Sequence, residues 1–335
     1  EHRTMQGFAV VGCFAAVLIL TPLAARLSWK LGAVDVPRDW RRMHTDTLPR
    51  AGGMAVFAAV AAAMLASGPL TRETATALAG GAAVFCIGLA DDILPLPPLA
   101  RLTVQTLAAT VGAAGAGVRG VLPFLGSVLW LLAMTNAHNF IDGLDGLFAG
   151  SAALEGIGIA AVLSLSGRTD RALMPLLLSS ACLGFLRYNR HPARVFAGDC
   201  GSGAVGFLLG VTALPALTEP AWKLGILAPL FVFAYPLTDL TAAVLRRTAR
   251  GKSPFSADRG HLHHRICAMG IPQSACAGIL WGLSATMGIC GVLLTRAGDA
   301  IPAAISAVAA VAVLILIRHT LEQEAEKRAA GRKAP

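Results

Sequence analysis

The chain has 335 residues, of which 55% are hydrophobic and only 14% are charged, and its mean hydropathy is +0.65. An average soluble domain carries roughly 25% charged residues, so this composition excludes a disordered chain, a coiled coil and a soluble enzyme with a hydrated surface. The net charge of +9 would suit nucleic acid, but the distribution of the basic residues indicates a membrane protein, and no nucleic-acid partner is expected.

Apolar runs of about 17–25 residues, long enough to cross a bilayer, recur along the whole chain. The sequence therefore predicts an all-α, polytopic integral membrane protein with about eleven transmembrane helices. No basic segment precedes the first run and no small-residue cleavage site follows it, so we expect a span there and not a signal peptide. The predicted spans are 5–27, 51–68, 75–90, 99–117, 121–137, 146–166, 172–187, 203–219, 223–245, 273–295 and 300–318.

The connections between these spans alternate between short ones and longer ones that carry most of the charge. Roughly three quarters of all Lys and Arg fall on the side of the odd-numbered connections, which the positive-inside rule assigns to the cytoplasm. The N-terminus is then outside and the C-terminus is cytoplasmic. We expect one transmembrane domain over 1–318 and a cytoplasmic tail over 319–335. The candidate catalytic loops on the cytoplasmic face lie near 28–50, 91–98, 136–146, 187–203 and 246–272.

Reactive side chains are concentrated in these five cytoplasmic loops. A purely structural membrane protein needs none of them, so their convergence on one face indicates a functional site. The candidate residues in these loops are Arg42, His44, Asp91, Asp92, Asn136, Asn139, Asp142, Asp145, Asp199, Arg259, His261, His263, His264 and Arg265.

The acidic residues suggest a metal-bound phosphate. Asp91 and Asp92 are adjacent, and like charges repel unless a cation or a hydrogen-bond network holds them. Together with Asn139 and Asp199 they offer hard oxygen ligands, which suit Mg²⁺, with Mn²⁺ as an alternative. Because Mg²⁺ is commonly shared between protein carboxylates and substrate phosphates, acidic residues beside arginines indicate a phosphorylated, metal-chelated substrate.

Glycines and histidines in the same loops admit two interpretations each. Gly52 and Gly53, and likewise Gly201 and Gly203, precede apolar helices whose first amides can bind phosphate oxygens; the alternative is close helix packing. For Gly201 and Gly203 we favour phosphate. The three histidines between 261 and 264 do not place three ligands on one helical face, so a phosphate-binding or proton-transfer role is favoured over zinc. Two acidic residues inside spans, Glu155 and Asp239, are expected to be paired or functional.

In this order, the five loops resemble the polyprenyl-phosphate N-acetylhexosamine-1-phosphate transferase superfamily, glycosyltransferase family 4. The resemblance runs from about Leu31 to about Arg265 at the level of motifs, and it is most specific over 250–265. The His261-Leu262-His263-His264 form is similar to the bacterial branch that makes lipid-linked GlcNAc-1-phosphate for O-antigen, enterobacterial common antigen or teichoic acid. A run of three consecutive histidines, typical of the phospho-MurNAc-pentapeptide branch, is absent from the sequence.

The resemblance implies an enzyme of the bacterial cytoplasmic membrane that couples a UDP-sugar to undecaprenyl phosphate and releases UMP. It also implies that Asn139 and Asp199 bind Mg²⁺, and that Asp91 and Asp92 deprotonate or position the lipid phosphate. His261, His263 and His264 are expected to be catalytic residues on the sugar-phosphate side. Substrate binding is expected of the remaining candidates: Arg42, His44, Arg101, Asn136, Asp142, Asp145, Arg259 and Arg265. The UDP-N-acetylhexosamine used, the downstream polymer, the lipid length and the oligomeric state, with a homodimer as one alternative, stay open.

The sequence departs from the family pattern at several positions. Arg42 and Arg101 stand where lysine is usual, which keeps the charge but replaces a compact ammonium by a planar guanidinium. Ala197 and Cys200 flank Asp199 in an unusual combination, and Pro95, Pro97 and Pro98 stiffen the loop after the aspartate pair. Two alternatives are weighed: the pentapeptide transferase, and a secondary transporter, which would place its ionisable residues near the membrane midplane and show repeated halves.

Overall fold

The computed structural model describes residues 2–36, 46–218, 227–253 and 260–296, together with residues 304, 308 and 312. Helices dominate this part of the chain, and one short antiparallel sheet pairs Val34 with Pro49 and Asp35 with Leu48. In chain order the elements are α1 (His2–Leu31), β1 (Val34–Asp35), β2 (Leu48–Pro49), α2 (Gly53–Ala66), α3 (Arg72–Ile93), α4 (Pro98–Gly115), α5 (Val121–Ile141), α6 (Leu147–Leu165), the 3₁₀ turn η1 (Thr169–Arg171), α7 (Leu173–Asn189), α8 (Gly198–Thr218), α9 (Leu227–Val232), α10 (Ala234–Ala249), α11 (Leu262–Cys267) and α12 (Gln273–Arg296).

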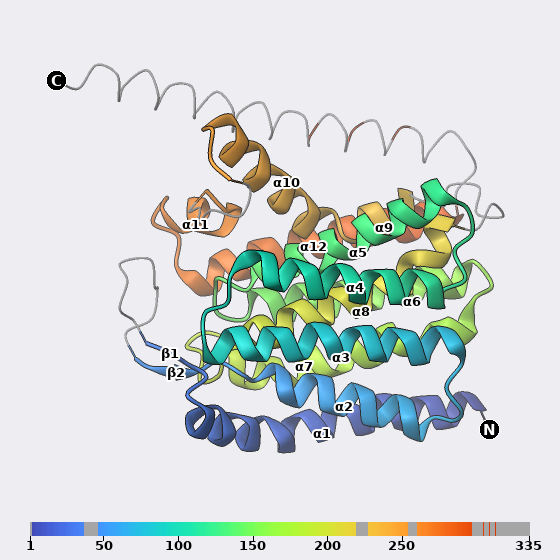
Figure 1. Ribbon diagram of the computed structural model, residues 1–335, viewed down its shortest axis with the longest axis horizontal. Helices are drawn as coiled ribbons and strands as arrows, with labels where there is room; N and C mark the ends of the chain where they lie inside the picture. The colour runs from blue at the N-terminus through green and yellow to red at the C-terminus, as the bar shows by residue number, and fades with distance from the viewer. Residues whose placement is uncertain are drawn as a thin grey trace.

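The long helices run side by side as a bundle (Figure 1). The N-terminus lies at one end, whereas β1, β2, α11 and the connection between α3 and α4 lie at the other. Because α1 to α8 alternate in direction, the connections after α1, α3, α5 and α7 come to the same end. This arrangement brings the loops singled out in the sequence together.

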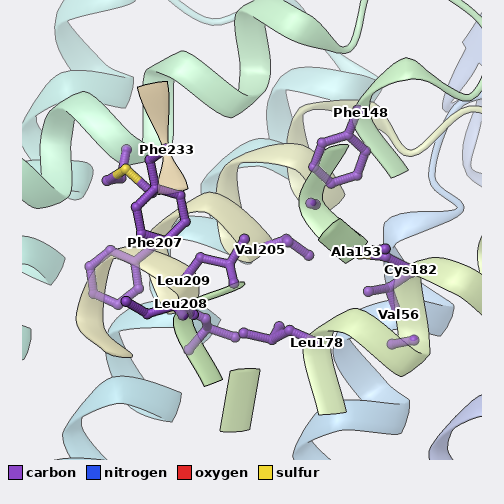
Figure 2. Close-up of a cluster of buried hydrophobic side chains, with 14 of the residues drawn as sticks. Val56, Phe148, Ala153, Leu178, Cys182, Val205, Phe207, Leu208, Leu209 and Phe233 are labelled. Atoms are coloured by element: carbon purple, nitrogen blue, oxygen red, sulfur yellow. The ribbon is translucent and has the colours of Figure 1, made fainter. Parts of the chain in front are cut away.

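Helix α8 forms the centre of the bundle and contacts α2 to α7 and α9. Every residue from Cys200 to Pro215 is buried, which explains why this helix is apolar on all sides. Figure 2 shows three of its side chains, Phe207, Leu208 and Leu209, within a cluster that α2, α6, α7 and Phe233 complete. The first turn of α8 is therefore held in place by a closely packed core.

Five described helices are long and apolar enough to cross a membrane: residues 5–31, 72–93, 121–141, 147–165 and 273–296. Together with the exposed apolar side chains on α1, such as Phe8 and Ile19, they confirm an all-α membrane protein. A helix covers each of the first eight predicted spans and the tenth. The predicted span 300–318 lies outside the described residues apart from 304, 308 and 312.

The prediction of one continuous span over 223–245 is wrong. Helix α9 ends at Val232, Phe233 leaves the helical geometry, and α10 then runs to Ala249. Helix α10 is amphipathic, and its buried face carries Asp239, Arg246 and Arg247 beside apolar residues. Charged side chains on that face suit contact with other protein segments better than contact with lipid.

Two helices extend further than their apolar runs, and this changes where the acidic residues lie. Helix α3 continues to Ile93, so Asp91 and Asp92 belong to its last turn and not to a loop. Pro98 occupies the first turn of α4, where its missing N–H costs nothing. Helix α5 continues to Ile141 and includes Asn136 and Asn139. The reactive residues are therefore fixed by helix ends, which hold a side chain more rigidly than a loop does.

Candidate functional site

Asp92 joins the last turn of α3 to the first turn of α8. Its Oδ1 accepts a hydrogen bond from the Asp199 backbone N–H at 2.9 Å, and its Oδ2 accepts one from the Cys200 N–H at 3.0 Å. The first amides of a helix have no partner within the helix, and a carboxylate there also interacts favourably with the helix dipole. Asp92 thus caps α8 from another helix, and its side chain is fully buried.

The carboxylate of Asp199 lies between two arginines. Arg50 donates from Nη2 to Oδ1 at 2.7 Å, and Arg101 donates from Nη1 to Oδ2 at 2.9 Å. The same Arg101 nitrogen contacts Asp91 Oδ2 at 2.7 Å, while Asp91 Oδ1 accepts the Leu96 N–H at 2.6 Å. The repulsion expected between the adjacent aspartates is therefore relieved by arginines, and the arginine predicted at position 101 does contact this centre.

Arg50 was not among the residues predicted for the site, although it lies in the Pro49–Gly53 segment. Its Nε contacts Asp92 Oδ1 at 3.1 Å, so one guanidinium joins Asp92 and Asp199. We call Arg50, Asp91, Asp92, Arg101 and Asp199 the carboxylate–arginine centre. The available signal was the position of Arg50 two residues before Gly52 and Gly53, at the start of α2.

Backbone hydrogen bonds fix the segment that carries Arg50. The Arg50 N–H donates to Ala33 O at 2.9 Å, and the Phe196 N–H donates to Pro49 O at 2.9 Å. On the far side, the N–H groups of Gly52 and Gly53 donate to the carbonyls of Phe196 and Ala197, both at 2.9 Å. The interpretation of Gly52 and Gly53 as phosphate-binding amides is therefore wrong.

Close packing explains the glycines near the start of α8. A Cβ on Gly53 would lie 2.1 Å from the Gly201 Cα, and one on Gly201 would lie 2.6 Å from the Gly53 Cα. Gly198 has a φ of +75°, and a Cβ there would meet both Arg50 O and the Asp92 carboxylate. Since the amides that follow Gly198 are bound by Asp92, the phosphate interpretation of Gly201 is also replaced by a packing role.

Asn139 and Asp199 lie together, as the predicted metal ligands should. The Asn139 side chain hydrogen-bonds Asp199, and its Oδ1 accepts from Ser202 Oγ at 3.0 Å. Within the described ranges, no group of three or more His, Cys, Asp or Glu side chains is arranged to hold a metal ion. Mg²⁺ commonly binds one or two protein oxygens and completes its shell with water and substrate phosphates, so the pair fits that mode of binding.

Asp142 follows α5 and faces the same centre. It accepts a backbone hydrogen bond from Gly198, and desolvation raises its pKa well above the ordinary value. Arg50 opposes this shift, whereas the charges of Asp199 and Asp92 add to it. A further cation that enters the centre would therefore stabilise the charged form of Asp142.

Two other candidates have different partners. Asp145 Oδ2 accepts from His191 Nδ1 at 2.8 Å and from the Ala193 N–H at 3.0 Å, so it ties the turn after α5 to the segment before α8. Asn136 donates to Gln105 Oε1 at 3.0 Å and to Leu132 O at 2.9 Å. Gln105 lies on α4, one turn after Arg101. Both residues support the walls of the site.

The histidines form a second cluster on α11. Asp239 Oδ2 contacts His261 Nδ1 at 2.7 Å, and its Oδ1 accepts the Leu262 N–H at 2.8 Å. The rings of His261 and His263 are stacked with centroids 5.7 Å apart, and His264 lies 4.3 Å from His263. Burial lowers the pKa of His263 to about 3, and among the described residues neither of its ring nitrogens has a hydrogen-bond partner.

The turn after α5 connects this histidine cluster to the carboxylate–arginine centre. A Cβ on Gly143 would lie 2.7 Å from His263 Nε2, so the histidine packs against Gly143, the residue that follows Asp142. Phe140, one turn earlier, packs its ring edge on His261 at 5.2 Å and lies 4.8 Å below the guanidinium of Arg247. The two clusters are two walls of one candidate active site.

Three predicted residues, Arg42, His44 and Arg259, lie outside the described residues. Arg265 follows the histidines on α11 and is half-buried. Both acidic residues predicted to be paired inside spans have partners: Asp239 has His261, and Glu155 Oε2 contacts His138 Nε2 at 2.7 Å. That expectation is confirmed.

A transferase that acts on phosphates at a membrane surface is the class that this fold and site define. Residues 74–216 match the family described as glycosyl transferase family 4. A Bacillus subtilis protein named probable undecaprenyl-phosphate N-acetylglucosaminyl 1-phosphate transferase is 34% identical over 307 residues, covering 86% of this chain and 85% of its own. The chain belongs to this family and to the branch that the resemblance indicated.

Further relatives agree with that assignment. A Mycolicibacterium smegmatis protein named decaprenyl-phosphate N-acetylglucosaminephosphotransferase is 35% identical, with 79% of this chain and 77% of its own covered. An Escherichia coli protein named undecaprenyl-phosphate alpha-N-acetylglucosaminyl 1-phosphate transferase is 27% identical, with 85% and 82% covered. The names of these proteins differ in the polyprenyl group but not in the sugar.

Proposed function

We propose that this protein transfers GlcNAc-1-phosphate from UDP-GlcNAc to a polyprenyl phosphate, most simply undecaprenyl phosphate, giving the lipid diphosphate sugar and UMP. The observation that carries the proposal is the position of Asp199, between Arg50 and Arg101 and beside Asn139, at the buried start of α8. The relatives' names supply the substrates. In this proposal the reaction begins the synthesis of a cell-envelope polysaccharide such as O-antigen or teichoic acid.

The reaction joins two anions, so the residues of the site must reduce their repulsion. A phosphate oxygen of the lipid forms a bond to the β-phosphorus of UDP-GlcNAc, and the bond to UMP breaks. Arg50 and Arg101 lie where they can bind the diphosphate, and the histidine cluster with Arg265 lies where it can bind the sugar-phosphate side. Most of the rate enhancement then comes from positioning and electrostatic stabilisation, as is general for phosphoryl transfer.

Asn139 and Asp199 would hold Mg²⁺, or Mn²⁺ in its place, and the ion would supply positive charge to the donor diphosphate. Asp92 holds Asp199 in position, because both of its oxygens are bound to the amides of α8. It is therefore a positioning residue in this proposal and not the base. Asp91, whose Oδ2 contacts Arg101 Nη1 at 2.7 Å, is placed to orient the lipid phosphate.

The proposed topology keeps eleven membrane segments, of which the ninth is interrupted at Phe233, with the N-terminus outside, the C-terminus in the cytoplasm and the site facing the cytoplasm of a bacterial inner membrane. The domain covers 1–318 and the tail 319–335. Five apolar helices support this arrangement, as does the concentration of Lys and Arg in the connections after the odd-numbered predicted spans. It lets one substrate approach from lipid and the other from water.

The test compares two sugar donors with the wild-type protein, and the wild type with the Asp199→Ala variant. Purified protein in detergent is expected to form lipid-linked product and UMP from UDP-GlcNAc, but not from UDP-MurNAc-pentapeptide. Asp199→Ala is expected to abolish product while the protein stays folded in the membrane. Product from the pentapeptide donor alone would favour the peptidoglycan transferase. Substrate uptake into vesicles without any UMP release would favour the transporter, against which the family membership already weighs.

A further inference from the structure

Arg50 takes the position that a cation would take in the carboxylate–arginine centre. Its guanidinium contacts two carboxylates from two different helices, Asp92 on α3 at 3.1 Å and Asp199 on α8 at 2.7 Å. Arg101 contacts the second carboxylate oxygen of Asp199 at 2.9 Å. Each oxygen of the proposed metal ligand thus already has an arginine within hydrogen-bonding distance.

Four carboxylates act on the charge of Arg50. Burial works against its charged form, but Asp199, Asp92, Asp35 and Asp142 outweigh burial and raise its pKa. Asp35 belongs to β1 and is buried, so the acidic surroundings extend beyond the centre itself. A guanidinium in such surroundings provides the positive charge that these acidic groups need in order to lie together.

We propose that Arg50 is a positioning residue that neutralises Asp199 when the metal is absent and turns to the donor diphosphate when a divalent ion binds Asp199. This inference rests on the proposed function. A second cation near the same carboxylate oxygen is opposed by like-charge repulsion, so metal and guanidinium compete for Asp199. The released guanidinium keeps its charge beside the newly bound phosphates, where its fork can bind two oxygens.

The structure allows Arg50 to move without disturbing the fold. Its backbone is held on both sides, by Ala33 and through the bond between Pro49 and Phe196, so only the long side chain needs to turn. When the guanidinium leaves Asp92, that buried carboxylate still accepts two amide hydrogen bonds from α8. No buried charge is therefore left without a partner.

The test measures metal binding without substrate, on the full chain in detergent, by the loss of free Mn²⁺ signal in electron paramagnetic resonance. Arg50→Gln removes the competing cation and is expected to bind Mn²⁺ about tenfold more tightly than the wild type. The same variant is expected to form lipid-linked product at least about tenfold more slowly, with a raised KM for UDP-GlcNAc. A residue with a merely structural role would not move metal affinity and activity in opposite directions.

Arg171→Gln is the matched control. Arg171 pairs with Glu73 at 3.0 Å, and its side chain is 27% exposed against 28% for Arg50. The control is expected to leave both Mn²⁺ affinity and product formation at the wild-type level. If Arg50→Gln does not fold, Arg50→Lys replaces it in the test. One ammonium cannot reproduce the two contacts of the guanidinium, so about threefold tighter Mn²⁺ binding than in the wild type is expected.

Unchanged or weaker Mn²⁺ binding in the folded Arg50 variant would overturn the inference. Tighter Mn²⁺ binding with a normal rate and KM would overturn the part that assigns Arg50 to the diphosphate. A failure of the proposed function can be told apart from a failure of this inference. If the wild type makes no product from UDP-GlcNAc while the Mn²⁺ shift is present, the competition at Asp199 stands and the choice of substrate is wrong.

Discussion

Asp92 at the end of α3 binds the backbone N–H of Asp199 with one carboxylate oxygen, at 2.9 Å, and that of Cys200 with the other, at 3.0 Å. The residue proposed to bind the metal is thus held in place by a neighbouring helix. The two members of the aspartate pair consequently differ in role: Asp92 binds the start of α8, whereas Asp91 contacts Arg101 at 2.7 Å.

Substitution of the two aspartates should separate these roles. Asp92→Ala leaves two buried amides without their acceptor, at about 1–3 kcal/mol for each, and should lower the melting temperature clearly. Asp91→Ala should reduce product formation with a smaller loss of stability, because it removes one backbone acceptor, that of the Leu96 N–H, instead of two. Thermal unfolding in detergent and the product assay give the two readouts. Equal stability losses in both variants would contradict this division.

A methyl group at the contact between α2 and α8 should not be tolerated. Gly53→Ala places a Cβ 2.1 Å from the Gly201 backbone, so the helices must separate and the free energy of unfolding should fall by about 1–3 kcal/mol. Gly282→Ala is the matched control, since a Cβ at Gly282 has no atom within 4 Å. Its melting temperature should equal that of the wild type or exceed it. A neutral Gly53→Ala would show that the contact is looser than described.

The buried pair of His138 and Glu155 lies inside the bundle, and both side chains are fully buried. Removal of one partner leaves a buried polar or charged group alone, so Glu155→Leu should cost about 3–5 kcal/mol of stability. The double variant His138→Leu with Glu155→Leu removes both groups and should recover much of that loss. A double-mutant cycle of unfolding free energies measures the coupling. If the effects of the two single substitutions on the unfolding free energy simply added up, the two side chains would not be energetically coupled.

Acid should destabilise the protein through His263. Its pKa is about 3 in the folded protein against an ordinary value of 6.5, so between these values the unfolded chain binds one more proton. This contribution to stability is complete above pH 6.5 and is lost as the pH falls toward 3, by up to about 1.4 kcal/mol per pH unit. Unfolding measured from pH 7 to pH 5 should show a shallower pH dependence in His263→Gln. Parallel curves for variant and wild type would refute the assignment.

Hydropathy predicts most of the fold because the membrane requires long apolar helices. It does not locate helix ends that carry charge, since Asp91, Asp92 and Asn139 lower the hydropathy before the helix stops. Those residues are helical because partners on other segments, such as Arg101 and the amides of α8, satisfy them. The break at Phe233 was missed for the related reason that an apolar run gives no sign of an interruption within it.

The site was predicted as a set of residues but not as a set of contacts. The motifs identified the aspartates, Asn139 and the histidines, and the structure brings Asp91, Asp92, Asn139 and Asp199 into one centre, with His263 packed against the turn after α5. Arg50 was left out of the predicted site because its place near two glycines does not reveal which side chains it contacts. Its importance comes from two carboxylates that are 42 and 149 residues away in sequence.

The most direct test of the account is transfer of radiolabelled GlcNAc-1-phosphate from UDP-GlcNAc to undecaprenyl phosphate by the purified protein in detergent, with and without Mg²⁺. We predict a lipid-linked radiolabelled product and equimolar UMP, both dependent on the metal and both lost in Asp199→Ala. Product at full yield without a divalent ion, or undiminished product from Asp199→Ala, would contradict the central role given to this carboxylate.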